Sequence, residues 1–167
     1  MIRTTKAGGF FMYYSFIMLK PDALERGLTI PVLTYLKNAG IEIEMIDCRK
    51  VDTKLLEQHY AEAIGKLGPD FERKCTDYFT NRWTIPVIVK SEQPDLIAQI
   101  RHIVGATNPA AAEKGTIRGD LGIDSYEKCG AEDRCCQNLI HASDSPEAVR
   151  REIALWFGED YAEKYAK

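Results

Sequence analysis

The stretch Asn138-Leu-Ile-His-Ala-Ser-Asp-Ser-Pro-Glu147 changes from strand to helix within ten residues. A short apolar run, Leu139-Ile140, has the character of a strand that leads into His141. Ser145 and Pro146 then predict a helix start, because serine caps free backbone N–H groups and proline fits the first helical position. A histidine at such a junction is either a structural residue or a displayed reactive group. The local sequence alone slightly favours the structural role.

Length and charge limit the classes of protein that this chain can belong to. The 167 residues fit one domain with a real hydrophobic core. A net charge of −3 gives no basic face for nucleic acid. The apolar run Phe10 to Leu19, of about ten residues, is too short to span a membrane and lacks a small-residue cleavage site. We predict a poorly ordered extension over residues 1–14, one domain over residues 15–167, and a cytoplasmic protein without a membrane partner.

The five cysteines include no C-x-x-C pair. An odd number without paired spacing predicts neither a disulfide framework nor a zinc site, and it indicates a reducing compartment. Cys129, Cys135 and Cys136 are candidate metal ligands near His141, but their spacing fits no zinc pattern. A flexible loop with free thiols is the preferred interpretation.

Three apolar stretches before residue 90 have the length and pattern of strands. Residues 15–19 form a continuous apolar run, which is typical of a strand covered on both faces. Residues 41–45 alternate between apolar and acidic side chains, and a phase slip at Met45-Ile46 predicts a bulge or twist. Residues 85–89 are β-branched, but Pro86 predicts an edge strand or a later start because proline donates no ladder hydrogen bond.

Helical spacing follows each of these strands. Helical patterns cover residues 32–39, 55–64, 71–79, 96–104 and 149–157, and a polar region covers 105–137. The order predicts an α+β protein with a ferredoxin-like βαββαβ fold, in which helices pack on one face of a four-stranded antiparallel sheet. Extra helices and a long loop complete this prediction. A doubly wound parallel sheet is the alternative from the pattern alone.

The chemistry does not lie in a glycine-rich phosphate loop, since neither common form of that motif occurs. Cations stand near the ends of elements instead, at Lys20, Arg101 and Arg118. Each of them alone is more simply a solvated or ion-paired side chain. Arg118 is the best candidate, because neighbouring glycines let the backbone bend tightly and a guanidinium fork suits phosphate.

Four motifs taken together resemble the nucleoside diphosphate kinase family: Lys20-Pro-Asp, Thr107-Asn-Pro, Gly115-Thr-Ile-Arg-Gly-Asp120 and Asn138-x-x-His-x-Ser-Asp-Ser. The resemblance runs from about Phe16 to Phe157. It implies transfer of the γ-phosphate of a nucleoside triphosphate, typically ATP, to a nucleoside diphosphate. It also implies a ping-pong mechanism in which His141 carries the phosphate. A neutral imidazole is a competent nucleophile for this task.

The resemblance implies roles for further residues. Its catalytic residues would be His141, Lys20, Ser143 and Glu152, and its nucleotide-binding residues would be Lys20, Tyr60, Phe71, Arg101, Thr107, Arg118 and Asn138. Without the resemblance, Tyr60 would be a core residue and Glu152 a solvated carboxylate. Phosphoryl transfer needs positioning and charge neutralisation, which these cations would supply. Mg²⁺ is the expected cofactor, carried by the nucleotide phosphates without a protein metal cage.

The chain departs from the family pattern between Tyr60 and Pro86. This segment is longer than the common form, and Gly-Pro-Asp-Phe-Glu replaces the usual Phe-Phe-Pro-Gly. Phe71 is our candidate for the aromatic side chain that stacks on the base, with Phe79 or Trp83 as alternatives. Cys75 stands where a leucine is common.

A second departure is an insertion over residues 124–137, between Arg118 and His141. A solvated surface loop is the preferred interpretation of this insertion. The alternatives are a rim for the nucleotide site and a contact between subunits.

Partners follow from the resemblance as well. It implies nucleoside di- and triphosphates as substrates, a homo-oligomer (tetramer or hexamer) and no need for nucleic acid. The competing hypothesis is a regulatory protein on the same fold that binds nucleotides without catalysis. A ferredoxin-like RNA-binding module would need exposed aromatic residues on the sheet and a basic face. The negative net charge argues against that class.

Overall fold

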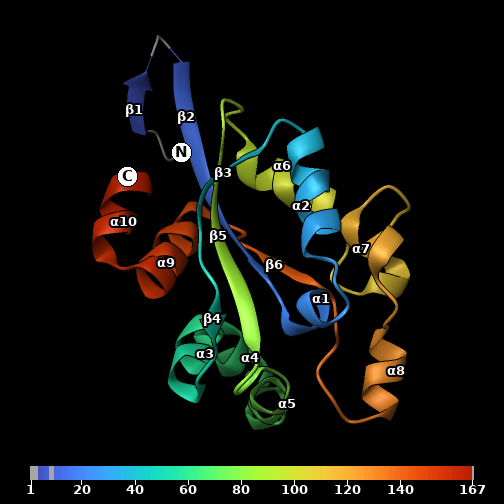
Figure 1. The fold of residues 1–167 in the computed structure, drawn as a ribbon. Coiled ribbons are helices and arrows are strands. Elements are labelled where there is room, and N and C mark those ends of the chain that lie inside the picture. Colours follow the sequence, from blue (N-terminus) through green and yellow to red (C-terminus); the bar gives the residue numbers. More distant parts are fainter. Residues whose placement is uncertain (1–3, 8–9, 167) are drawn as a thin grey trace.

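The computed structural model describes residues 4–7 and 10–166 and has an antiparallel sheet at its centre (Figure 1). The strands of the described residues are β1 (Thr4–Ala7), β2 (Phe10–Leu19), β3 (Glu42–Ile46), β4 (Arg49–Lys50), β5 (Trp83–Ser91) and β6 (Ile140–Ala142). The core order is β6-β2-β5-β3, and each neighbouring pair is antiparallel. The predicted four-stranded ferredoxin-like sheet is therefore confirmed. β1 pairs with the start of β2, and β4 pairs with β5.

Helices cover both faces of this sheet (Figure 1). They are α1 (Pro21–Glu25), α2 (Thr29–Asn38), α3 (Thr53–His59), α4 (Ala61–Leu67), α5 (Pro69–Phe79), α6 (Leu96–Val104), α7 (Ile117–Leu121), α8 (Tyr126–Ala131), α9 (Pro146–Phe157), α10 (Glu159–Tyr165) and the 3₁₀ helix η1 (Pro109–Ala111). The prediction of helices on one face only was wrong. Successive side chains of β2 point to opposite faces, and both sets are buried. Phe16 and Met18 pack with α3, α5 and α9, whereas Ile17 and Leu19 pack with α2 and α6.

Two expectations about strands need correction. β2 begins at Phe10, before the predicted start at Ser15, so part of the predicted extension belongs to β1 and β2. Residues 1–3 and 8–9 of that extension lie outside the described part of the chain. β5 begins at Trp83 and lies between β2 and β3, so both alternatives predicted from Pro86, an edge strand and a later start, were wrong. The carbonyl oxygen of Pro86 accepts from the Asp47 N–H at 3.1 Å, just where β3 ends. The proline nitrogen points to that same side, so no hydrogen bond to β2 is lost.

Other local signals in the sequence agree with the structure. The register between β3 and β5 shifts between Ile43 and Met45, next to the predicted bulge. Gly40 ends α2 with a φ of 74°, a left-handed conformation that glycine adopts without strain. Ser145 caps α9 by accepting from the Ala148 N–H at 3.1 Å. The Ser145 cap fixes the start of α9 shortly after β6 and thereby positions the residues between these two elements.

Candidate active site

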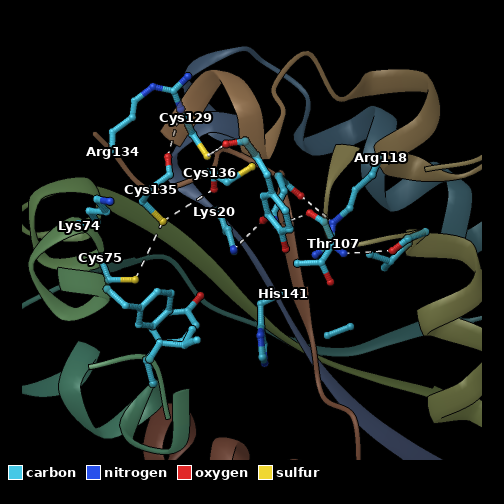
Figure 2. A pocket seen from close by; sticks show the side chains of 18 of the residues that line it. Lys20, Lys74, Cys75, Thr107, Arg118, Cys129, Arg134, Cys135, Cys136 and His141 are labelled. Atoms are coloured by element: carbon cyan, nitrogen blue, oxygen red, sulfur yellow. Dashed lines mark hydrogen bonds between the residues drawn. The ribbon is translucent and has the colours of Figure 1, made fainter. Parts of the chain in front are cut away.

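A pocket of about 540 Å³ lies beside the ends of β2 and β6 (Figure 2). Its lining includes all of the predicted nucleotide-binding residues and the predicted phosphate carrier: Lys20, Tyr60, Phe71, Arg101, Thr107, Arg118, Asn138 and His141. The volume lies within the usual range for small-molecule sites. The predicted Ser143 and Glu152 are absent from the described lining. Glu152 contacts His141, and Ser143 contacts Glu152.

Lys20 directly follows β2 and points into the pocket (Figure 2). Its ammonium group donates to Asn138 Oδ1 at 2.7 Å, and its side chain is buried. Burial lowers the pKa of Lys20, because a charged amine loses its hydration there. One neutral amide partner leaves donors of this ammonium group available to a bound anion.

Asn138 connects three segments of the site. Besides accepting from Lys20, its side chain donates to the Thr107 carbonyl oxygen at 2.9 Å. The next residue, Leu139, has a φ of 70°, which is strained for a branched side chain. Two contacts hold this turn: the Leu139 N–H donates to Asp22 at 3.1 Å, and its carbonyl oxygen accepts from the Lys20 N–H at 2.8 Å. The turn aligns Lys20 with the strand that carries the histidine.

Arg118 joins separate segments of the site through hydrogen bonds and also carries a positive charge. It donates to three backbone carbonyl oxygens, those of Asn138 at 3.0 Å, Gly105 at 3.1 Å and Ile140 at 2.6 Å. Two of its five N–H donors remain for a ligand. Burial lowers its pKa to about 10, so the group stays charged at neutral pH. Gly119 makes this placement feasible, since a Cβ there would lie 1.8 Å from the Glu113 carbonyl oxygen.

The mouth of the pocket carries more exposed donors. Arg101 and Thr107 are exposed, and Arg101 makes a long contact of 3.5 Å with the Ala142 carbonyl oxygen. Cationic side chains outnumber carboxylates in the lining, where Asp144 is the carboxylate among the described residues. A concave surface of this charge attracts anions, and guanidinium groups suit phosphate oxygens.

Glu152 and Ser143 fix the ring of His141. Glu152 lies on α9 with only 3% of its surface exposed. One of its carboxylate oxygens is 2.9 Å from His141 Nε2, and the other accepts from the Ser143 hydroxyl at 2.5 Å. A carboxylate partner places the proton of a neutral ring on Nε2 and the lone pair on Nδ1. Nδ1 has no hydrogen-bond partner in the described part of the chain.

His59 belongs to none of the four motifs, but it lies beside His141 in the structure. Its ring lies 4.5 Å from the ring of His141, nearly perpendicular to it. The Trp156 Nε1–H donates to His59 Nδ1 at 3.1 Å, which places the proton of a neutral His59 on Nε2. Burial, and then the nearby His141, lower the pKa of His59 well below its usual value, so the residue is neutral. The adjacent Tyr60, itself a predicted site residue, was the one clue in the sequence.

Aromatic side chains form another wall of the pocket. The rings of Tyr60 and Phe71 meet edge to face at 6.1 Å, and both rings line the pocket. The Tyr60 hydroxyl is buried without a hydrogen-bond partner among the described residues. Burial raises the pKa of Tyr60 well above its usual value, so the hydroxyl stays protonated as a donor. The alternatives Phe79 and Trp83 are absent from the described lining.

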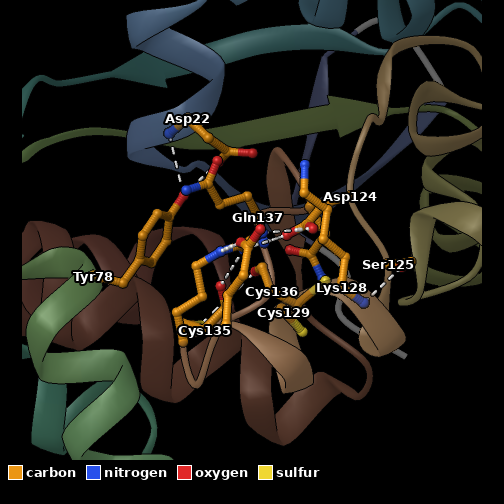
Figure 3. Close-up of polar contacts among 12 residues, drawn as sticks. Asp22, Tyr78, Asp124, Ser125, Lys128, Cys129, Cys135, Cys136 and Gln137 are labelled. Atoms are coloured by element: carbon orange, nitrogen blue, oxygen red, sulfur yellow. Dashed lines mark hydrogen bonds and ion pairs between the residues drawn. The ribbon is translucent and has the colours of Figure 1, made fainter.

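The insertion of residues 124–137 completes the pocket, so the interpretation as a solvated surface loop was wrong. It folds into α8 and contributes lining residues that include Tyr126 and Cys135. Asp124 organises it by accepting from Arg134 at 2.6 and 2.9 Å. Asp124 also accepts from the Gln137 N–H at 2.8 Å (Figure 3). Although burial opposes it, these donors lower the pKa of Asp124 to about 2. The hydrogen bonds give the insertion a defined structure.

Metal ligands are sparse in the described residues. One cluster of potential ligand atoms, from His59, His141 and Glu152, lies within 4.8 Å. Two imidazoles and one carboxylate do not resemble the oxygen ligands that Mg²⁺ prefers, and the carboxylate is already paired with His141. Among the described residues, no helix combines the length and the apolar composition needed to cross a bilayer.

The fold and the pocket around His141 define an α+β protein with a cation-lined cavity. Comparison with known proteins gives the family. The family model for nucleoside diphosphate kinase matches residues 14–162, so the chain belongs to the nucleoside diphosphate kinase family and is an enzyme. This confirms the resemblance inferred from the four motifs.

Individual relatives agree with this assignment. A nucleoside diphosphate kinase from Methanobrevibacter smithii is 37% identical over 146 residues, which is 87% of each chain. One from Saccharomyces cerevisiae is 38% identical over 146 residues, covering 87% of this chain and 86% of the relative. A Borrelia burgdorferi nucleoside-diphosphate kinase with bound vanadate and ADP, a transition-state mimic, has a TM-score of 0.83 at 26% identity, covering 89% of each chain. A Pyrobaculum aerophilum NDP kinase has a TM-score of 0.79 at 29% identity, covering 93% of this chain and all of that chain.

Proposed function

We propose that this enzyme transfers the γ-phosphate of a nucleoside triphosphate, typically ATP, to a nucleoside diphosphate through a phosphorylated His141. The observation that carries the proposal is the chain of contacts from Ser143 through Glu152 to the ring of His141. Glu152 contacts Nε2 at 2.9 Å and Ser143 contacts Glu152 at 2.5 Å, while Nδ1 is free of partners in the described chain. The lone pair on Nδ1 would attack the phosphorus atom. Glu152 would stabilise the positive charge that the ring gains.

The cations of the pocket would neutralise the transferred phosphoryl group. Lys20 and Arg118 are buried and held by hydrogen bonds, so they need little reorganisation when the charge moves. Arg101 and Thr107, at the exposed mouth, would close on the outer phosphates. The Tyr60 hydroxyl, which has no hydrogen-bond partner among the described residues, supports a phosphate in this pocket, because a phosphate oxygen would give that buried donor its acceptor.

We assign the base of the nucleotide to the aromatic wall. Phe71 lines the pocket and is partly exposed, as a stacking platform must be. Stacking uses a π-face that every base has, so the enzyme should accept several bases. When bound, Mg²⁺ would neutralise phosphate charge, and the nucleotide phosphates with several waters would hold it. Asp144, the carboxylate of the described lining, would be the candidate to contact such waters.

We infer further that the enzyme is a homo-oligomer of the cytoplasm. Exposed apolar side chains on the edge strand β3, Ile43 at 44% and Ile46 at 48%, support a subunit contact. The odd number of cysteines without paired spacing in the sequence supports a reducing compartment. Light scattering after size exclusion tests the assembly, and a mass equal to one chain would contradict it.

A labelling experiment tests the central proposal. Brief incubation with γ-labelled ATP should give protein-bound phosphate that is labile to acid and stable to alkali, and GDP should discharge it as GTP. His141→Gln should abolish the label. His102→Gln is the matched control, because His102 is exposed on α6 outside the pocket lining.

Two outcomes would contradict the proposal. Normal labelling and transfer by His141→Gln would exclude His141 as the phosphate carrier. Nucleotide binding by the unaltered protein without any labelling would favour the regulatory alternative instead.

A further inference from the structure

The two departures from the family pattern meet in the structure. Cys75 belongs to the lengthened segment before Pro86, and Cys135 belongs to the insertion of residues 124–137. Their Sγ atoms lie 4.0 Å apart although the residues are 60 positions apart in the chain. Figure 2 shows the two thiols directed at each other beside the pocket. Both residues line the pocket that holds His141.

Charged contacts hold the insertion against α5 in this arrangement. Asp133 of the insertion lies 2.9 Å from Arg73 and 3.0 Å from Lys74, both on α5. Exposed pairs of this kind are weak singly. Within the insertion itself, the buried Asp124 binds Arg134 with both carboxylate oxygens, which gives this segment a defined structure. The folded chain thus brings the two sulfur atoms to 4.0 Å from each other.

The two thiols have different environments. Cys135 is partly exposed in the pocket, whereas Cys75 is 1% exposed. The hydrogen bond with Cys75 lowers the pKa of the Cys135 thiol, burial opposes this, and the Lys20 ammonium lowers it further. The same hydrogen bond raises the pKa of Cys75, which therefore keeps its proton. In contrast, burial raises the pKa of Cys136 to about 12, so this neighbour remains an unreactive thiol.

We propose that Cys135 and Cys75 form an oxidisable dithiol of the pocket, which a peroxide converts into a disulfide. In the first step the Cys135 thiolate attacks a peroxide oxygen, an S–O bond forms, the O–O bond breaks and an alkoxide or hydroxide leaves. In the second step the Cys75 sulfur attacks the Cys135 sulfur, the S–S bond forms, and the S–O bond breaks. The Cys75 proton leaves with the hydroxide as water. The two thiols lose two electrons, which reduce the peroxide.

The disulfide would change the shape of the pocket. An S–S bond is about 2 Å long, so the sulfur atoms must approach by about 2 Å and draw the insertion towards α5. Misplacing a reacting group by about 1 Å costs up to about 100-fold in rate. We therefore expect phosphate transfer to fall at least about tenfold and to recover with dithiothreitol. This consequence rests on the proposed function, whereas formation of the disulfide does not.

Mass spectrometry of the full chain tests the chemistry directly. Hydrogen peroxide is added, the remaining thiols are alkylated, and peptides are mapped without reduction. A linked peptide pair containing Cys75 and Cys135 is expected. Cys75→Ser, and Cys75→Ala as a second variant, should instead accumulate a sulfenic acid at Cys135 that dimedone traps. Cys48→Ser is the matched control, because Cys48 is exposed and lies outside the pocket lining.

The outcomes distinguish formation of the disulfide from its predicted effect on phosphate transfer. Absence of the Cys75–Cys135 link in a folded protein, or equal trapping by dimedone in Cys48→Ser and Cys75→Ser, would overturn the proposal. A linked protein that transfers phosphate at the full rate would overturn the predicted control of activity. If the reduced protein never transfers phosphate but still forms the link, then the proposed function fails and the dithiol stands.

Discussion

Replacing Glu152 with glutamine removes one negative charge and little else. The amide oxygen can still accept from His141 Nε2, which is 2.9 Å from the present carboxylate. The amide N–H₂ can donate to the Ser143 hydroxyl, which would keep its second contact with the Phe16 carbonyl oxygen at 3.2 Å. Hydrogen bonds to charged groups contribute about 1.5–3 kcal/mol, and neutral ones about 0.5–1.5 kcal/mol. The expected loss at the positively charged phosphohistidine is therefore about 1.5 kcal/mol.

This loss corresponds to about tenfold in rate, because each 1.36 kcal/mol changes a rate tenfold. The assay is transfer from γ-labelled ATP to GDP, in which kcat should fall about tenfold while the free energy of unfolding in urea does not decrease. Glu147→Gln is the matched control, because Glu147 is exposed on the same helix and should leave transfer unchanged. A Glu152→Gln protein that is folded and transfers phosphate at the original rate would refute the role assigned to this carboxylate.

Three further predictions concern single side chains. Tyr60→Phe removes a buried hydroxyl that has no partner in the described chain. Calorimetry should show weaker nucleotide binding together with a free energy of unfolding that is unchanged or higher by about 1 kcal/mol. Weaker binding with a lower free energy of unfolding would contradict this prediction. Asp124→Asn should destabilise the protein by about 2 kcal/mol at pH 7, since the pKa of Asp124 is lowered to about 2. That stabilisation is present above pH 4 and is lost as the pH falls towards 2, so urea unfolding should give a difference from the unaltered protein that narrows below pH 4; a constant difference would exclude the Arg134 pair as its source. Gly119→Ala places a Cβ 1.8 Å from a backbone carbonyl oxygen and should cost at least about 2 kcal/mol in the same assay, whereas Gly130→Ala, which meets nothing within 4 Å, should not destabilise.

Local patterns predicted much of the fold. The apolar run at Phe16 indicated a strand buried on both faces, and β2 is such a strand. Ser145 and Pro146 indicated the start of α9, which begins at Pro146. Such signals succeed because capping and side-chain alternation act over a few residues. The prediction of an edge strand from Pro86 was wrong, because a proline in a strand costs a hydrogen bond only when its nitrogen faces a paired strand. The pairing of distant strands decides which neighbour the nitrogen faces.

The sequence by itself determined the family and the identity of the candidate phosphate carrier, because the four motifs keep their residue types and order. Only the tertiary structure decided what each residue contacts. Glu152 reaches His141 from another element, Arg118 divides its donors between three carbonyl groups, and Cys75 meets Cys135 across 60 positions. The physical reason is that these contacts form when buried faces of distant segments pack together. No pattern within one segment specifies the partner that packing will bring to it.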